Sequence, residues 1–286
     1  MFIAKALKDY KVLDTGGGMK LEMWGRYILS RPDPQVIWEK QMPELWKRAD
    51  AVYHRSNEGG GKWEFFKELP ERWVLKYGNL SFYVRPTGFK HTGLFPEQSA
   101  NWDFLADKIK NAGFAPRVLN LFAYTGGATL ACAAAGAAVT HIDAARSMNG
   151  WAKENLALSG LADRQVRIIA DDCLKFVKRE QRRGKFYDGI IMDPPSYGRG
   201  ADGRVFRTED NLFELVSETA KLLSDKPLFF VISSYTTGLS SVVCRNMLDI
   251  CLAGRAGRIE AGDLVIPVEN QGVLLPCGTT TRWHSL

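Results

Sequence analysis

The sequence lacks the features that mark secreted and membrane-spanning proteins. No apolar run approaches the roughly 20 residues that a membrane-spanning helix needs. The first residues, MFIAKALKDYKVLD, carry charges where a signal peptide has an unbroken apolar stretch. Only five cysteines occur among 286 residues, and their scattered positions form neither CxxC pairs nor a disulfide framework. These absences predict a cytoplasmic protein that has no membrane partner.

Two further absences exclude common cofactor sites. Histidine is rare and dispersed, so no metal site is predicted. The four histidines are His54, His91, His141 and His284. The dinucleotide fingerprint GxGxxG is also missing, because the third and sixth positions counted from Gly126 are Ala128 and Ala131. The sequence therefore disfavours NAD as a cofactor.

The charge balance favours an anionic partner. The formal net charge is +6 and the isoelectric point is about 9.0, and a basic surface attracts anions such as nucleic acids. Basic residues concentrate in residues 175–185, where Glu180 interrupts them. A solvated helix face is the simpler interpretation of that cluster.

The first 85 residues differ in texture from the rest of the chain. They are rich in tryptophan, proline and glycine, and residues 20–29 and 73–84 alternate as antiparallel strands do. A helix is expected near residues 35–47. We therefore predict a small α+β extension over residues 1–85, which is expected to bind substrate or RNA. Aromatic and basic residues together suit the stacking of bases, although tryptophan-rich segments also form the cores of small domains.

Beyond Pro116, short apolar runs alternate with segments of helical period. The runs predict strands at 117–122, 138–142, 166–170, 189–192 and 228–233, and the segments between them predict helices at 127–137, 148–159, 173–179 and 210–223. Such alternation forms right-handed βαβ units around a parallel sheet. Residues 258–268 and 272–277 predict a closing antiparallel hairpin. Residues 86–286 are thus expected to form an α/β domain with a Rossmann-like sheet.

Ligands of open α/β sheets bind beyond the carboxyl ends of the strands, and three predicted strand ends carry suitable residues. The first lies in VLNLFAYTGGATLACAAAG, residues 118–136, where the strand runs into Thr125-Gly126-Gly127. Glycine allows the backbone to approach a ligand closely, and the small residues that follow allow the helix to pack tightly on the sheet. This segment predicts a loop that contacts a cofactor.

Acidic residues end the next two strands. Asp143 closes the strand VTHID, where a carboxylate can accept both ribose hydroxyls of an adenosyl ligand. The alternative is that Asp143 caps the following helix. The third strand ends in Ala170-Asp171-Asp172, and we assign Asp172 to the adenine amino group. The other carboxylate is expected to be solvated or to cap the next helix.

The most specific motif is Asp193-Pro194-Pro195-Ser196-Tyr197, which follows the apolar strand GIIM. Two consecutive prolines end the ladder and stiffen the loop. An acidic residue followed by two prolines and an aromatic ring is an arrangement that grips a flipped base. Asp193 would accept from the base nitrogen, while Pro194 and Tyr197 would hold the ring. A Pro-Pro turn alone is common. The interpretation therefore depends on where this motif lies, at the end of a strand that follows two other strand ends with suitable residues.

With these motifs, the sequence resembles class I S-adenosylmethionine (SAM)-dependent RNA methyltransferases related to the bacterial large-subunit (23S) rRNA methyltransferases. The resemblance runs from about residue 83 to residue 235. It is strongest in FKHTGLFPEQSANW (89–102), in the two segments that contain Gly126 and Asp143, and in YDGIIMDPPSY (187–197). It implies a seven-stranded class I methyltransferase sheet in residues 86–286 and SAM as the cofactor.

The resemblance also implies the residues of the SAM pocket. They are Lys90, Gln98, Phe122, Tyr124, Gly126, Asp143, Asp172 and Asp193, to which the loop analysis adds Thr125. Two departures from the family concern the substrate. No PUA-type RNA-binding module precedes the domain, and Ser99 replaces the arginine that follows the glutamine in the family's Asp-Gln-Arg motif.

The function predicted from the sequence is methylation of a base nitrogen in RNA, with ribosomal RNA as the expected substrate. A small-molecule methyltransferase is one alternative, with the N-terminal extension covering its pocket. A non-catalytic factor that binds SAM or RNA is another. Salt-dependent binding to RNA separates the first two hypotheses, and labelled methyl transfer to any acceptor excludes the third.

The cysteine positions predict the type of acceptor atom. Methylation of carbon 5 of a pyrimidine needs a cysteine thiolate that adds to carbon 6. The two places that suit such a cysteine read Pro195-Ser196-Tyr197 and Ser233-Ser234-Tyr235, without a thiol. Direct transfer to a nitrogen is therefore expected, with an oxygen as the second choice of acceptor, and replacing each cysteine by serine should leave turnover nearly unchanged. Loss of activity in a well-folded variant, with a covalent adduct between the parent enzyme and 5-fluoropyrimidine RNA, would contradict this prediction.

Overall fold

The computed structural model describes residues 1–5, 7–56, 60–199, 205–236, 238–269 and 271–286, which form two compact units. The sheet unit contains residues 1–2, 100–264 and 277–286, and the N-terminal unit contains residues 3–99 and 265–276. The division falls after residue 99, whereas the sequence suggested residue 85. Backbone hydrogen bonds such as Arg85 N–H to the Thr92 carbonyl attach the intervening segment to the N-terminal unit.

The sheet unit is built on the Rossmann-like sheet expected from the sequence. Its strands are β1 (Phe2–Ile3), β9 (Arg117–Leu121), β10 (Ala138–Asp143), β11 (Val166–Ala170), β12 (Gly189–Met192), β15 (Phe229–Ser234), β16 (Arg258–Pro267) and β17 (Leu274–His284). Their order is β1-β16-β17-β15-β12-β9-β10-β11. The five strands from β15 to β11 are parallel, and β17 pairs antiparallel with β15. The seven strands of a class I methyltransferase sheet are therefore present, with β1 added at one edge.

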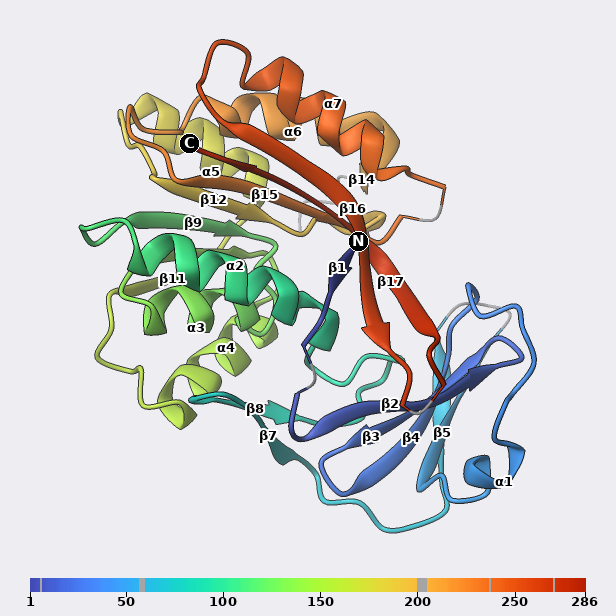
Figure 1. The fold of residues 1–286 in the computed structure, drawn as a ribbon. Helices are drawn as coiled ribbons and strands as arrows, with labels where there is room; N and C mark the ends of the chain where they lie inside the picture. Colours follow the sequence, from blue (N-terminus) through green and yellow to red (C-terminus); the bar gives the residue numbers. More distant parts are fainter. Residues whose placement is uncertain (6, 57–59, 200–204, 237, 270) are drawn as a thin grey trace. The chain divides into compact units, whose positions relative to one another are not determined.

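Helices cover both faces of this sheet (Figure 1). One face carries α2 (Ser99–Lys110), α3 (Gly127–Ala134) and α4 (Arg146–Leu158), and the other carries α5 (Cys173–Arg182), α6 (Thr208–Ala220) and α7 (Ser241–Cys251). Neighbouring residues of β15 pack on opposite faces of the sheet. Phe229 belongs to the same core cluster as Leu105 of α2, and Phe230 belongs to the same cluster as Phe176 of α5. None of the described helices is long and apolar enough to cross a bilayer.

The N-terminal unit contains a mixed five-stranded sheet and a separate antiparallel hairpin. The five-stranded sheet is formed by β2 (Tyr10–Gly16), β3 (Met19–Trp24), β4 (Tyr27–Pro32), β5 (Ala51–Arg55) and β6 (Gly61–Phe65), and in it β4 and β5 are parallel. A hairpin is formed by β7 (Trp73–Tyr77) and β8 (Leu80–Val84), and the 3₁₀ turn η1 (Pro96–Gln98) follows. The two segments predicted to be antiparallel strands, 20–29 and 73–84, thus form the β3–β4 and β7–β8 hairpins.

The helix expected over residues 35–47 is wrong for most of its length. Only α1 (Pro43–Trp46) is helical. The preceding residues bond to the β2–β3 turn instead, because Gly17 N–H donates to the Trp38 carbonyl at 2.7 Å and Gly18 N–H donates to the Val36 carbonyl at 2.8 Å. These carbonyls would have to accept intrahelical bonds in a helix. The contact between distant segments therefore replaced the local preference.

A buried ion pair joins β3 to β4. The Arg31 guanidinium donates to both carboxylate oxygens of Glu22, at 2.6 and 2.7 Å, and the Tyr10 hydroxyl donates to the same carboxylate at 2.7 Å. Burial alone would raise the pKa of Glu22, but the Arg31 and Lys20 charges and these hydrogen bonds outweigh it and lower the pKa to about 2. Arg31 also donates to the Lys90 carbonyl at 2.9 Å.

Replacing Glu22 by glutamine should destabilise the protein strongly, because the charge of Arg31 would remain buried without a counter-charge. We expect a loss of about 3–5 kcal/mol in the free energy of unfolding at neutral pH, measured by urea denaturation. Since the folded pKa lies below the ordinary value of 4.5, the difference from wild type should shrink as pH falls from 4.5 towards 2. Glu44→Gln, which breaks the exposed pair with Lys47, is the control and should have little effect.

Candidate functional site

The register of the parallel strands brings the predicted site residues of the sheet unit to one edge. Leu121, the last residue of β9, pairs with Ile142 of β10 and with Met192 of β12. The next residues along these strands, Asp143 and Asp193, therefore lie on either side of the loop that follows β9. Because β10 and β12 flank β9, the strand order reverses here, which is where open α/β sheets bind ligands.

The loop after β9, residues 122–126, has an unusual backbone. Phe122 and Tyr124 have positive φ angles, 54° and 50°, and Gly126 has φ 92°. Hydrogen bonds hold this shape: Ala123 N–H donates to the Ile142 carbonyl at 3.0 Å, and Gly126 N–H donates to the Ala123 carbonyl at 3.0 Å. Two such non-glycine residues in one short loop are the strain that clusters at ligand sites.

Two glycines allow the loop to pass directly into α3. A Cβ on Gly126 would lie 3.1 Å from Leu130 and 3.2 Å from the Ala152 Cβ, and its φ favours glycine in any case. A Cβ on Gly127 would lie 2.6 Å from the Trp102 ring. The amino end of α3 therefore lies against its neighbours without space for a side chain. The close approach of this loop to a ligand stays a prediction. The adjacent Thr125 is buried, and its carbonyl accepts from the Asn155 side chain at 3.0 Å.

Asp143 links this loop to the start of α4. Its Oδ2 accepts from Tyr124 N–H at 2.9 Å, and its Oδ1 accepts from Ala145 N–H at 2.8 Å. Burial raises the pKa of Asp143, although both amides favour the charged form. The second bond is made to the amide of Ala145, the N-cap residue of α4, which has no side-chain cap, so Asp143 does not cap the helix as the alternative from the sequence supposed. The first bond positions the loop. Each carboxylate oxygen retains capacity to accept a further bond, which suits a ribose hydroxyl.

The two carboxylates after β11 divide their roles. Asp172 caps α5 by accepting from Lys175 N–H at 2.8 Å through Oδ1. Asp171 accepts from the Arg179 guanidinium at 2.6 Å. The capping role thus belongs to Asp172, the residue that we assign to adenine, and the Oδ2 atom takes no part in this cap. The assignment of Asp172 to adenine stays a prediction.

Two hydroxyl residues fasten the loop after β12, residues 193–197. Thr208, at the start of α6, donates its hydroxyl to the Pro195 carbonyl at 3.2 Å, and its N–H donates to the Ser196 carbonyl at 3.2 Å. Thr236, which follows β15, donates to the Ser196 hydroxyl at 3.0 Å. Two prolines and three hydrogen bonds therefore fix the position of Asp193 and Pro194. Residues far along the chain supply these bonds, so no local sequence pattern identified them.

Tyr197 is 56% exposed at the end of this loop. It begins β13 (Tyr197–Arg199), which pairs antiparallel with β14 (Val205–Arg207). This hairpin also brings the Phe206 ring to within 5.7 Å of the Phe122 ring, centroid to centroid. The loop after β9 and the loop after β12 are thus bridged by an aromatic pair that the sequence analysis did not identify.

The remaining predicted residues, Lys90 and Gln98, belong to the N-terminal unit. Burial lowers the pKa of Lys90, and the charges of Lys20 and Arg31 add to the effect. Burial likewise lowers the pKa of the neighbouring His91 to about 4, so its ring is neutral at neutral pH. Gln98 ends the η1 turn. Their part in a SAM pocket stays a prediction.

The seven-stranded sheet with its antiparallel β17, and the acidic residues that follow β10, β11 and β12 at its ligand edge, define a class I SAM-dependent methyltransferase fold. The sequence agrees with this class. A family model described as S-adenosylmethionine-dependent methyltransferase matches residues 50–224, which is more than half of the chain. The chain therefore belongs to this family and uses SAM as its cofactor. The matched range contains every predicted site residue.

Solved structures and curated relatives support this assignment. The crystal structure of a SAM-dependent methyltransferase from Agrobacterium tumefaciens is 37% identical, with a TM-score of 0.96, over all of this chain and 93% of that chain. The ribosomal RNA large subunit methyltransferases K/L of Syntrophotalea carbinolica and of a Shewanella strain (W3-18-1) are 35% and 31% identical over 50% and 65% of this chain. The matches span only 19% and 27% of those relatives.

Replacing Asp143 by alanine should weaken SAM binding by about ten- to a hundredfold, because a charged acceptor for the ribose is lost. Asp143→Asn keeps one acceptor oxygen for the backbone amides, so its affinity for SAM should lie between the affinities of the wild-type protein and of Asp143→Ala. Isothermal titration calorimetry measures the SAM affinity of both variants. The control is Asp225→Ala, on the same unit but away from the carboxyl ends of the strands. Unchanged affinity in a folded Asp143→Ala protein would remove this residue from the site.

Proposed function

We propose that this protein methylates a base nitrogen in RNA, with ribosomal RNA as the substrate class. The observation that carries the proposal is the loop 193–197. A carboxylate, a buried proline and an exposed tyrosine follow one another there, directly beside the loop after β9. A flipped base needs these contacts: an acceptor for its nitrogen and an aromatic or apolar surface for its face.

The protein's contribution to such a reaction is positioning. Bound SAM supplies the methyl group on a sulfonium centre that is already activated, so the protein must align the acceptor with it. Asp193 would accept a hydrogen bond from the base nitrogen and orient its lone pair. Tyr197 would stack on the base, and Pro194 would close the other side. The hydrogen bonds from Thr208 and Thr236 keep this loop in one shape before substrate arrives.

An RNA substrate, rather than a small molecule, is supported by the basic N-terminal unit and by the relatives. The net charge of the whole chain is +6. In the N-terminal unit, Arg48, Arg55 and Lys62 are exposed. On β6 the Trp63 and Phe65 rings are stacked, with an interplanar angle of 28°, and Phe65 is itself exposed. Arg55 pairs with Gly61 and so lies on the same face of the β5–β6 pair as the two rings. A cation beside accessible rings suits single-stranded RNA. The matched K/L proteins are named as ribosomal RNA methyltransferases.

Methyl transfer to RNA tests the proposal directly. Incubation with labelled SAM and large-subunit rRNA that lacks the modification should label the RNA, and nuclease digestion should place the methyl group on a base nitrogen. Asp193→Asn should lower kcat on RNA by at least a hundredfold, because the base nitrogen loses its charged partner. Asp225→Asn is the matched control and should retain full activity.

The two alternatives give different results. RNA binding whose affinity does not fall as salt rises, together with transfer to a small acceptor only, would favour a small-molecule methyltransferase. Intact SAM binding without transfer to RNA or to small acceptors would indicate a non-catalytic binding factor. An Asp193→Asn protein with normal turnover on RNA would contradict the role proposed for the loop.

A further inference from the structure

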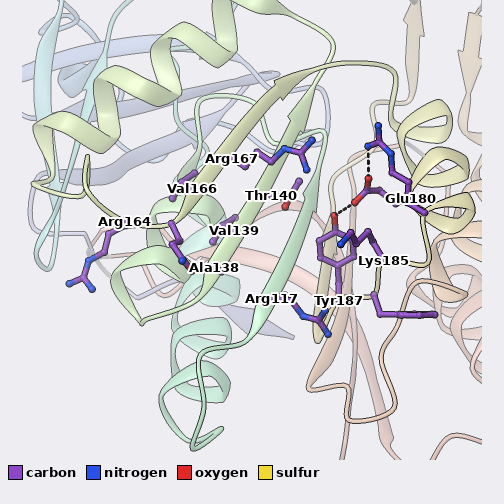
Figure 2. Close-up of a pocket in the computed structure, with 13 residues that line it drawn as sticks. Arg117, Ala138, Val139, Thr140, Arg164, Val166, Arg167, Glu180, Lys185 and Tyr187 are labelled. Carbon is purple, nitrogen blue, oxygen red and sulfur yellow. Dashed lines mark hydrogen bonds and ion pairs between the residues drawn. The ribbon is translucent and has the colours of Figure 1, made fainter.

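A pocket of about 700 Å³ lies at the opposite edge of the sheet, where the parallel strands begin (Figure 2). Arg117 is the first residue of β9, and Val166 and Arg167 are the first two of β11. Phe186 and Tyr187 lead into β12. A strand of five residues is roughly 17 Å long, so this pocket is separate from the carboxyl edge where methyl transfer is proposed.

Five cations and a single carboxylate line this pocket. The carboxylate, Glu180, is already satisfied, because Arg183 pairs with it at 3.1 Å and the Tyr187 hydroxyl donates to it at 2.8 Å. Arg117 contacts Asp188 at 3.4 Å, although more than half of its side chain remains exposed. The carboxylate of the pocket is therefore occupied by Arg183, and Arg117 is paired with Asp188, which does not line the pocket.

The other three cations are Arg164, Arg167 and Lys185. All three are exposed, and none makes an ion pair with a residue that the structure describes. In Figure 2, Arg117, Arg167 and Lys185 lie around Tyr187, and Arg164 lies at the other end of the pocket. They are not needed to balance the carboxyl end of α5, where Arg179 and Arg182 already lie in the last turn.

The accessible apolar surface of the pocket is an aromatic ring. Val139 lines the pocket but is only 2% exposed, because it packs in the core of the sheet unit, whereas the Phe186 ring is 46% exposed. A volume of about 700 Å³ falls within the range of small-molecule sites. The pocket thus combines an accessible ring with unpaired cations. A nucleoside phosphate has the matching parts, a planar base and an anionic group.

We propose that this basic pocket binds a nucleoside phosphate, with the base against Phe186 and the phosphate between Arg167 and Lys185, the two unpaired cations beside Tyr187. The same chemistry has two sources. One is a second segment of the RNA substrate, and this reading rests on the proposed function. The other is a free nucleotide, and this reading does not. In both cases the site lies outside the methyl-transfer edge and contributes binding rather than chemistry.

The test removes the two unpaired cations beside Tyr187 and compares them with two cations elsewhere on the same unit. Arg167→Gln/Lys185→Gln is the test variant, and Lys226→Gln/Arg245→Gln, also exposed, is the control with the same change in charge. Binding of a fluorescein-labelled single-stranded RNA 12-mer is followed by anisotropy at several salt concentrations. Binding of uridine 5′-monophosphate is followed by calorimetry, with S-adenosylhomocysteine present at saturation to keep the SAM pocket filled. Methyl transfer to rRNA is measured in parallel.

If RNA is the source, the test variant should bind the 12-mer about tenfold more weakly at low salt, and the slope of log K against log salt should fall by roughly 1.4, or about 0.7 for each lost phosphate contact. The KM for rRNA should rise at constant kcat, because the site is remote from the transferred methyl group. If free nucleotide is the source, only uridine monophosphate binding should fall, and Phe186→Ser should lower it further.

Two results would overturn the proposal. One is equal binding of both probes by the test and control variants, and the other is absence of binding of either probe to the wild-type protein. Methyl transfer distinguishes these failures from failure of the proposed function. If the wild-type enzyme methylates RNA and the test variant binds both probes normally, only the basic pocket is refuted. If the wild-type enzyme never methylates RNA but the test variant loses uridine monophosphate binding, the pocket is supported and the RNA substrate is refuted.

Discussion

The parallel pairing of β9 with both β10 and β12 is the constraint on which the ligand edge depends. Leu121 is held by a partner on each side, so the chain must leave the sheet at the same level on all three strands. The residues that follow are then neighbours although they are separated by 50 residues or more along the chain, as Asp143 and Asp193 are. A shift of one residue in either pairing would reverse the faces of the buried strand and separate these carboxylates.

Rigidity around this edge has a local cost. Positive φ angles at Phe122 and Tyr124 disfavour the loop by about 1–3 kcal/mol each. The Asp143 carboxylate and the carbonyls of β10 offset this cost through hydrogen bonds that any relaxed loop would lose. A substitution that relaxes the backbone is therefore expected to stabilise the fold and to impair the site at the same time. The loop after β12 avoids such strain, because its prolines and hydroxyl contacts define its shape.

The sequence predicted the alternating part of the molecule well, because each buried strand there is a short apolar run. The predicted strand 166–170 coincides with β11, and Asp143 and Asp193 stand at strand ends as expected. Strand segments that contain buried polar residues were not predicted. The last strand was expected to end at residue 277, yet β17 continues to His284 through Thr280, Thr281 and Arg282, which are buried. Arg282 is accommodated because Asn101 and the Ala100 carbonyl accept its hydrogen bonds.

Contacts between distant segments account for the other differences. Neither the bonds of residues 36–38 to the β2–β3 turn nor the ring pair of Phe122 and Phe206 follows from local periodicity. The residues that we propose contact ligands stood out as single motifs. The residues that hold those motifs in place, Thr208 and Thr236, did not, because hydroxyl side chains are common in loops and their partners are named only by the fold.

The hairpin of β16 and β17 has a consequence for how the chain is made. Residues 265–276 complete the N-terminal unit, where Glu269 N–H donates to the Val12 carbonyl and the Gln271 side chain donates to Asp14 at 2.7 Å. Residues 1–2, in turn, belong to the sheet unit. Domains usually fold in order as they leave the ribosome. Here residues 3–99 are joined in their unit by residues 265–276, and the sheet unit includes residues 277–286, so each unit needs a segment that is synthesised after residue 264.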